Sequence, residues 1–101
     1  MSVQAINIEQ VKKLIDEQIV TVADIRDPQS YHAAHIEDAV QVNDNNVQEF
    51  VANSDKTKPL LVYCYHGHSS QSAAEYFATM GFIEVYSMDG GFEAWRLQDS
   101  L

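Results

Sequence analysis

Cys64 is the residue with the clearest capacity for covalent chemistry, because a cysteine thiolate is a strong nucleophile. It directly follows the apolar run Leu60–Tyr63, which is typical of a strand covered on both faces. A rigid strand end would hold the thiol at a fixed position. A short polar loop comes next and leads into a helix; it contains Tyr65, His66, Gly67, His68, Ser69 and Ser70.

This loop is suited to stabilising a negative charge on Cys64. Gly67 allows a positive φ, so the chain can curl back and aim successive backbone N–H groups at one point. Ser69 or Ser70 can cap the following helix, whose N-terminus would lower the thiol pKa by roughly one unit. The net charge of −9 opposes ionisation, but salt screens it beyond about 8–10 Å. Base rates favour a buried, inert cysteine, yet the loop predicts a thiolate held by main-chain amides.

Strands and helices alternate along the chain and would position this loop. Asn7 with Gln10, Asp27 with Pro28, and the segment 44–46 are candidate helix starts, and Gly81 is a candidate helix end. The pattern predicts a parallel sheet with helices on both faces, and ligands at the carboxyl ends of its strands. Strands are predicted at residues 19–23, 39–42, 60–63 and 85–88, and helices at 8–15, 28–35, 47–51, 72–80 and 92–97.

Length and charge narrow the classes of function. The 101 residues are enough for one domain, which we expect to span residues 1–101. The chain has six Lys and Arg residues but 15 Asp and Glu residues. This excess of negative charge argues against nucleic acid or an anionic membrane as a partner. One cysteine allows no internal disulfide, no cysteine-cluster metal site and no resolving thiol. Without a membrane-spanning stretch or a signal peptide, a soluble cytoplasmic protein is expected.

Three segments, taken together, resemble the rhodaneses, a family of sulfurtransferases. They are residues 24–27 followed by 34–36, the loop 64–70, and the closing segment 89–95. The resemblance implies a rhodanese-like three-layer α/β fold, with a mainly parallel sheet of about five strands and helices on both faces. It also implies that Cys64 is the catalytic residue and that residues 65–70 bind the substrate and the persulfide. Asp24, Arg26 and His35 would be structural support.

The activity implied by this resemblance is sulfur transfer. The Cys64 thiolate would attack the outer sulfur of thiosulfate, sulfite would leave, and the resulting persulfide would pass its sulfur to cyanide or to a thiol or dithiol such as thioredoxin. Neither a metal nor an organic cofactor is needed. Many rhodaneses carry arginine where this chain has Ser69. We therefore expect weak thiosulfate affinity that does not fall as salt is added.

Other interpretations of these residues remain open at this stage. A cysteine phosphatase or arsenate reductase would need an arginine after the loop, and positions 69–72 hold none. A non-catalytic rhodanese-like binding module is a second alternative. Cys64, His66 and His68 could be metal ligands, but no fourth ligand is evident nearby. For Asp24 and Arg26, a buried bracing pair is favoured over substrate contact.

Overall fold

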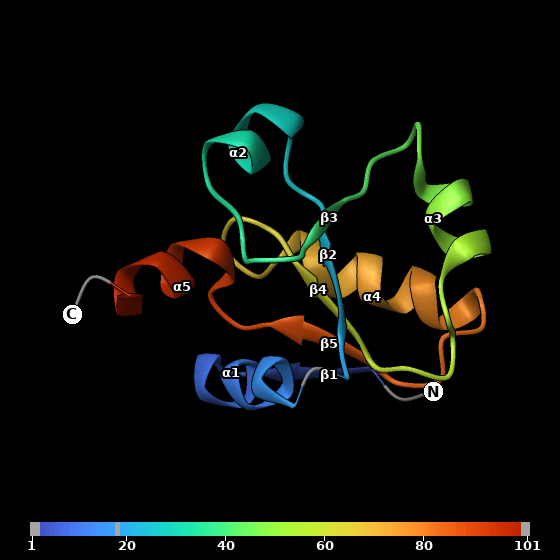
Figure 1. The fold of residues 1–101 in the computed structure, drawn as a ribbon, viewed down its shortest axis with the longest axis horizontal. Coiled ribbons are helices and arrows are strands. Elements are labelled where there is room, and N and C mark those ends of the chain that lie inside the picture. Colours follow the sequence, from blue (N-terminus) through green and yellow to red (C-terminus); the bar gives the residue numbers. More distant parts are fainter. Residues whose placement is uncertain (1–2, 18, 100–101) are drawn as a thin grey trace.

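The computed structural model describes residues 3–17 and 19–99, in which strands and helices alternate (Figure 1). The elements are β1 (Val3–Ile6), α1 (Ile8–Asp16), β2 (Thr21–Asp24), α2 (Pro28–Ala33), β3 (Val40–Gln41), α3 (Val47–Asn53), β4 (Leu60–Tyr63), α4 (Ser69–Thr79), β5 (Val85–Met88) and α5 (Gly91–Asp99).

Within the described residues, the five strands form one parallel sheet in the order β1-β5-β4-β2-β3. All four residues of the central strand β4 are buried, as expected for a strand covered on both faces. The ends of β2 and β5 flank the end of β4, since Asp24 pairs with Tyr63 and Ser87 with Val62. The segments that follow these three strands therefore meet at one edge of the sheet.

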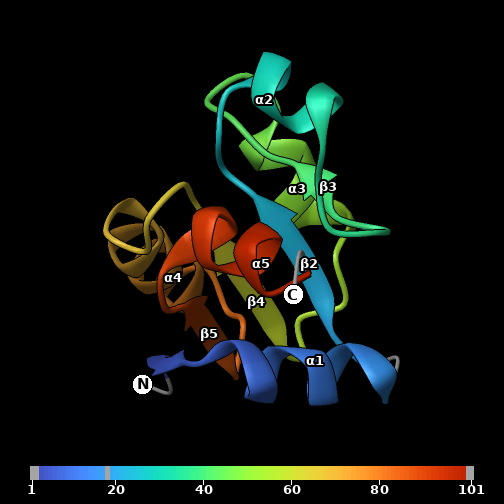
Figure 2. The same cartoon turned by 90° about the vertical axis from the view of Figure 1, so that its left-hand side faces the viewer.

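Helices cover both faces of the sheet, which confirms the predicted fold class. Leu61 and Tyr63 point into a core beneath α1 and α5, whereas Leu60 and Val62 point into a core beneath α3 and α4. Figure 2 shows α1 and α5 on the near side of the sheet and α4 behind it. Phe92 is buried in the first core and Trp95 packs against it, as the sequence predicted.

Several element boundaries differ from the sequence-based predictions. Strand β1 was not predicted, and α2 ends at Ala33 rather than at His35. Helix α4 begins at Ser69 rather than at Ser72, and α5 begins at Gly91. Among the described residues, no helix is long and apolar enough to cross a membrane.

Candidate active site

Cys64 lies directly after β4 and is 4% exposed. Its sulfur accepts hydrogen bonds from the backbone N–H groups of Gly67, at 3.2 Å, and Ser70, at 3.3 Å. Two amides from different positions of the loop thus converge on one atom. The sulfur is buried, but it faces the donors that a thiolate requires.

Gly67 gives the loop its shape. Its φ is +94°, and a Cβ at this position would lie 2.9 Å from the amide nitrogen of Gly90 and 3.2 Å from the carbonyl oxygen of Met88. Both the curl of the loop and its close packing against the segment after β5 therefore require glycine. His66 and His68, on either side of Gly67, are exposed, as is Ser69.

The start of α4 differs from the expectation that Ser69 or Ser70 would cap it. His68 occupies the N-cap position in a helical conformation, and its side chain makes no capping hydrogen bond. Ser70 lies inside the first turn, where its amide donates to the sulfur and its buried hydroxyl contacts the hydroxyl of Ser87 on β5, at 2.7 Å. The first turn thus directs its free amide towards Cys64 rather than towards a side-chain cap.

The N-terminus of α5 holds the loop from the other side. The N–H groups of Phe92 and Glu93 donate to the carbonyl oxygens of Cys64, at 2.8 Å, and Tyr65, at 3.1 Å. Gly91 lies so close to these carbonyls that any Cβ would overlap them. The glycine pair in the closing segment therefore lets α5 begin against the loop and fix the orientation of its peptide groups.

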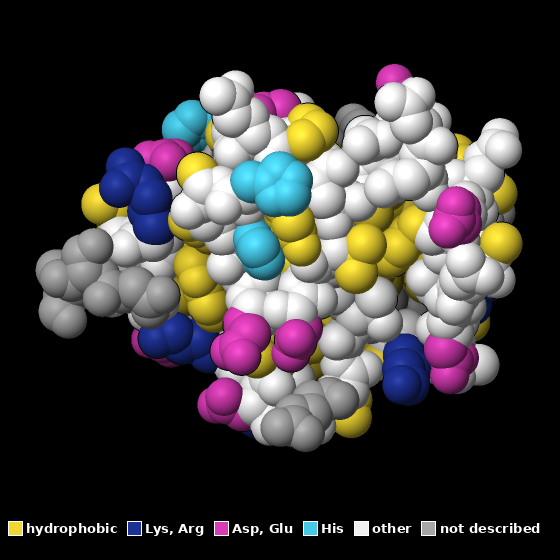
Figure 3. All heavy atoms as spheres, turned by 45° about the horizontal axis from the view of Figure 1, so that its top comes forward, with side chains coloured by type: hydrophobic (Ala, Val, Ile, Leu, Met, Phe, Trp, Pro, Cys, Tyr) yellow, Lys and Arg dark blue, Asp and Glu magenta, His cyan; other side chains and the backbone are white. Residues whose placement is uncertain are grey.

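Electrostatics favour ionisation of the thiol. Burial raises the pKa of Cys64, but hydrogen bonds from the Ser70 hydroxyl and from the amides of Ser70, Gly67 and His66 outweigh burial, and the pKa falls below the ordinary value of 9.0. Figure 3 shows histidine side chains near the middle of one face of the molecule and acidic groups further out. Loop 64–70 contains no lysine or arginine, so main-chain and hydroxyl donors provide the stabilisation.

Tyr65 links the loop to the start of α2. Its hydroxyl accepts a hydrogen bond from the Asp27 amide at 3.3 Å and lies 3.3 Å from the Ser30 hydroxyl. The side chain remains 42% exposed. Tyr65 therefore spans the gap between the cysteine loop and the segment after β2.

Asp24 and Arg26 form a buried ion pair behind the loop. The guanidinium donates to both carboxylate oxygens, its shortest N–O distance being 2.7 Å, and Nη2 also donates to the carbonyl of Ala34 at 2.6 Å. The guanidinium lies 4.1 Å from the centre of the Phe92 ring, at the start of α5. The pair thus connects the segments that follow β2, α2 and β5.

His35 lies two residues beyond α2. Its ring stacks on Tyr31 at 3.8 Å between centroids, and Nδ1 lies 2.7 Å from the Tyr31 carbonyl oxygen. Across the described ranges, no group of three His, Cys, Asp or Glu side chains could hold a metal ion.

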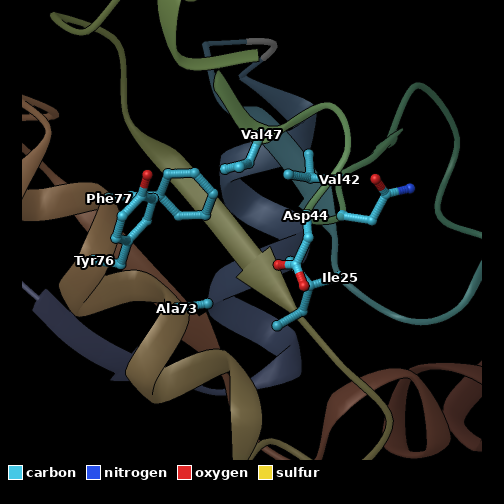
Figure 4. Close-up of a pocket in the computed structure, with 8 residues that line it drawn as sticks. Ile25, Val42, Asp44, Val47, Ala73, Tyr76 and Phe77 are labelled. Atoms are coloured by element: carbon cyan, nitrogen blue, oxygen red, sulfur yellow. The ribbon is translucent and has the colours of Figure 1, made fainter. Parts of the chain in front are cut away.

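A separate hollow of about 440 Å³ opens between α4 and the segment joining β3 to α3 (Figure 4). Its lining is largely apolar and includes Ile25, Val42, Val47, Ala73, Tyr76 and Phe77. None of its lining residues belongs to loop 64–70, so it is distinct from the cysteine site.

Comparison with known proteins agrees with this geometry. Residues 7–98 match the family described as the rhodanese-like domain. A curated relative named thiosulfate sulfurtransferase GlpE, from Pseudomonas aeruginosa, is 52% identical over 93 residues, which cover 92% of this chain and 84% of the relative. Another relative of that name, from Pseudoalteromonas translucida, is 45% identical over 96 residues, covering 95% and 91% of the two chains.

Solved structures show the same fold. The rhodanese-like domain protein of Staphylococcus aureus superposes with a TM-score of 0.79 at 22% identity, covering 91% of this chain and 90% of that one. The human single-domain sulfurtransferase TSTD1 gives 0.81 at 14% identity, covering 93% and 96%. The chain therefore belongs to the rhodanese family, as a homologue of the GlpE thiosulfate sulfurtransferases.

Proposed function

We propose that this protein moves the sulfane sulfur of thiosulfate through a persulfide on Cys64 to a thiol acceptor. The observation that carries the proposal is the convergence of the Gly67 and Ser70 amides on the Cys64 sulfur. Such an arrangement stabilises the thiolate needed for attack, and it is already in place before the reaction begins. The names of the GlpE relatives support thiosulfate as the donor.

In the first half-reaction, the Cys64 thiolate forms a bond to the outer sulfur of thiosulfate. The S–S bond of thiosulfate breaks, and sulfite leaves with the bonding electron pair. The negative charge moves to the outer sulfur of the persulfide. The loop lining supplied by Tyr65, His66, Gly67, His68, Ser69 and Ser70 would then surround the persulfide and provide donors for this charge.

In the second half-reaction, an external nucleophile attacks the outer sulfur, and Cys64 leaves as a thiolate. Because Cys64 is the only cysteine, the acceptor must be another molecule. A dithiol protein such as thioredoxin fits this requirement, and cyanide can replace it in an assay. A reactive free thiol also requires a reducing compartment, which we take to be the cytoplasm.

The remaining predicted residues would act by holding the loop in place. Asp24 and Arg26 brace the segments around it through their buried pair and the bond to Ala34. His35 would stabilise the end of α2 through its contacts with Tyr31. None of these three roles requires contact with the transferred sulfur.

Intact-mass measurement tests the proposal. The purified protein is incubated with thiosulfate, separated from it, and weighed before and after addition of cyanide or reduced thioredoxin. We expect a gain of one sulfur atom that either acceptor removes, and no gain in Cys64→Ser, which differs at the reacting atom alone. No sulfur uptake by the wild-type protein, or equal uptake by Cys64→Ser, would contradict it.

A further inference from the structure

We propose that the hollow between α4 and the segment joining β3 to α3 is the docking surface for a protein thiol that accepts the sulfur from Cys64. The partner inserts an apolar side chain into the hollow and places a basic group beside Asp44. The inference rests on the proposed function and deepens it, since it gives the acceptor of the second half-reaction a binding surface outside loop 64–70. It adds no chemical step to that half-reaction.

The hollow begins within one residue or one helical turn of the cysteine loop. Ile25 follows β2, and its amide donates to the carbonyl of Tyr63, the last residue of β4, at 3.0 Å. On α4, Ser69, Ala73 and Tyr76 are spaced four and three residues apart, so they lie on one face of the helix. This face leads from the exposed end of the loop to the wall of the hollow.

A protein acceptor must cover the hollow when its thiol reaches the cysteine. Cys64 is 4% exposed, so the partner's thiol has to lie directly against the loop. A stable protein interface buries about 800 Å² on each partner, which corresponds to a disc of about 16 Å radius. Tyr76 is seven residues along α4 from Ser69, or about 10 Å at a rise of about 1.5 Å per residue. The hollow therefore lies inside the footprint of a protein acceptor, whereas a small acceptor such as cyanide does not reach it.

The lining of the hollow indicates the chemistry of the partner. Figure 4 shows Tyr76 and Phe77 along one wall, and Val42, Asp44 and Ile25 along the other. Tyr76 is 42% exposed, and a half-exposed tyrosine is a typical aromatic anchor of protein interfaces. Asp44 is exposed and has no ion-pair partner among the described residues. With a net charge of −9, the chain favours a basic group over an acidic one at this rim, and it disfavours a second copy of itself.

The rim that carries Asp44 is formed before any partner binds. The side-chain oxygen of Asn43 accepts hydrogen bonds from the amides of Asn45, at 2.8 Å, and Asn46, at 3.2 Å. The opposite wall is a helix whose Phe77 is 2% exposed and packed in the core. Because both walls are already ordered, little conformational entropy is lost when a partner docks.

The test compares two acceptors of the same persulfide. The protein is loaded with sulfur from thiosulfate, freed of the donor and mixed with reduced thioredoxin or with cyanide, and the rate of sulfur loss is followed by intact mass. Tyr76→Ala removes the aromatic anchor, and Asp44→Lys reverses the charge of the rim. We expect transfer to thioredoxin to slow about ten-fold in Tyr76→Ala and about three-fold at low salt in Asp44→Lys. The rates with cyanide should not change.

Matched controls make the same kinds of change at positions that precede strands rather than follow them. Ile83→Ala truncates an exposed apolar side chain before β5, and Glu17→Lys reverses an exposed charge between α1 and β2. Neither control should change transfer to either acceptor. Melting temperatures show whether each variant is folded. If Tyr76→Ala does not fold, Asp44→Lys decides alone, because its side chain is exposed.

Four results would overturn the inference. They are unchanged transfer to thioredoxin in a folded variant of the hollow, an equal loss of transfer to cyanide, an equal loss in the controls, and a wild-type dimer that Tyr76→Ala dissociates, which would make a second copy of the chain the occupant. If the wild-type protein takes up sulfur but passes it only to cyanide, the inference fails while sulfur transfer stands. If it takes up no sulfur, the proposed function and the inference fail together.

Discussion

Gly91 is the point where α5 meets the cysteine loop most closely, and its replacement by alanine should loosen the site. Its φ is +60°, and a Cβ would lie 2.5 Å from the carbonyl carbon and oxygen of Tyr65 and 2.6 Å from the carbonyl oxygen of Cys64. These are backbone atoms, which cannot rotate away. Gly91→Ala must therefore push α5 from the loop and weaken the hydrogen bonds donated by Phe92 and Glu93.

The expected loss of stability has two parts. Left-handed backbone costs a residue with a Cβ about 1–2 kcal/mol, and overpacking adds about 1–3 kcal/mol. The sum of about 2–5 kcal/mol corresponds to a fall in Tm of at least roughly 10 °C for a domain of this size. Because the loop amides would move away from the sulfur, the pKa of the Cys64 thiol should also rise.

Gly81→Ala is the matched control. Gly81 also has a positive φ, +108°, but a Cβ there would meet only the flexible side chain of Lys56, at 3.2 Å to Cδ. We expect Gly81→Ala to lower Tm by less and to leave the Cys64 alkylation midpoint unchanged. Thermal melts and alkylation at several pH values give both quantities. An unchanged midpoint in folded Gly91→Ala would refute the view that α5 orients the loop.

Three further changes probe the stability and charge of the site. The pKa of Cys64 is lowered in the folded state, so thiol ionisation should stabilise the fold increasingly as pH rises from the folded pKa towards 9.0. Over that interval, the Tm of the wild-type protein should rise relative to the Tm of Cys64→Ser. A Tm difference that does not change with pH would contradict this. Glu93→Gln removes a partly exposed carboxylate that is paired with Arg96 at the start of α5, next to the cysteine loop. With one negative charge fewer beside the loop, kcat/KM for thiosulfate should rise about two-fold at low salt and less at high salt. Glu9→Gln on α1 should change neither value. Arg26→Ala leaves the buried carboxylate of Asp24 without its ionic partner. Denaturant unfolding should show that the free energy of unfolding falls by about 3–5 kcal/mol. A fall of less than about 1 kcal/mol would contradict the bracing role.

Features that depend on neighbours in the chain could be predicted from the sequence. The side chains of Asn7 and Gln10 exchange hydrogen bonds with each other's backbone at the start of α1, and Asp27 caps α2 ahead of Pro28. Each interaction joins residues three positions apart, so side-chain chemistry and spacing alone determine it.

Predictions failed where a side chain finds a distant partner or a partner on another element. Ser70 was a candidate cap for α4, but its hydroxyl contacts Ser87, 17 residues away. Asn46 occupies the N-cap position of α3, yet its side chain bonds to Gln41 and Asn43 instead of to the helix. Such choices depend on which elements pack together, and a local pattern does not contain that information.

Strand β1 and the contribution of α5 to the site were missed for the same reason. Strand β1 has no continuous apolar run, and its central residues Gln4 and Ala5 are exposed. It is held in the sheet by pairing with β5, which the local sequence does not reveal. Gly90 and Gly91, at the start of α5, are recognisable from the sequence only as part of the closing segment 89–95. Its contact with the cysteine loop follows from β5 lying beside β4.

The most direct test of the central claim is the pH dependence of Cys64 alkylation in the folded protein and in the same protein unfolded in concentrated urea. The unfolded chain keeps the thiol but loses the amides of Gly67 and Ser70 that converge on it. The structure predicts a lower midpoint in the folded protein, with measurable reactivity below the pH at which the unfolded thiol reacts. A folded midpoint equal to or above the unfolded one would contradict the proposed stabilisation of the thiolate by the loop.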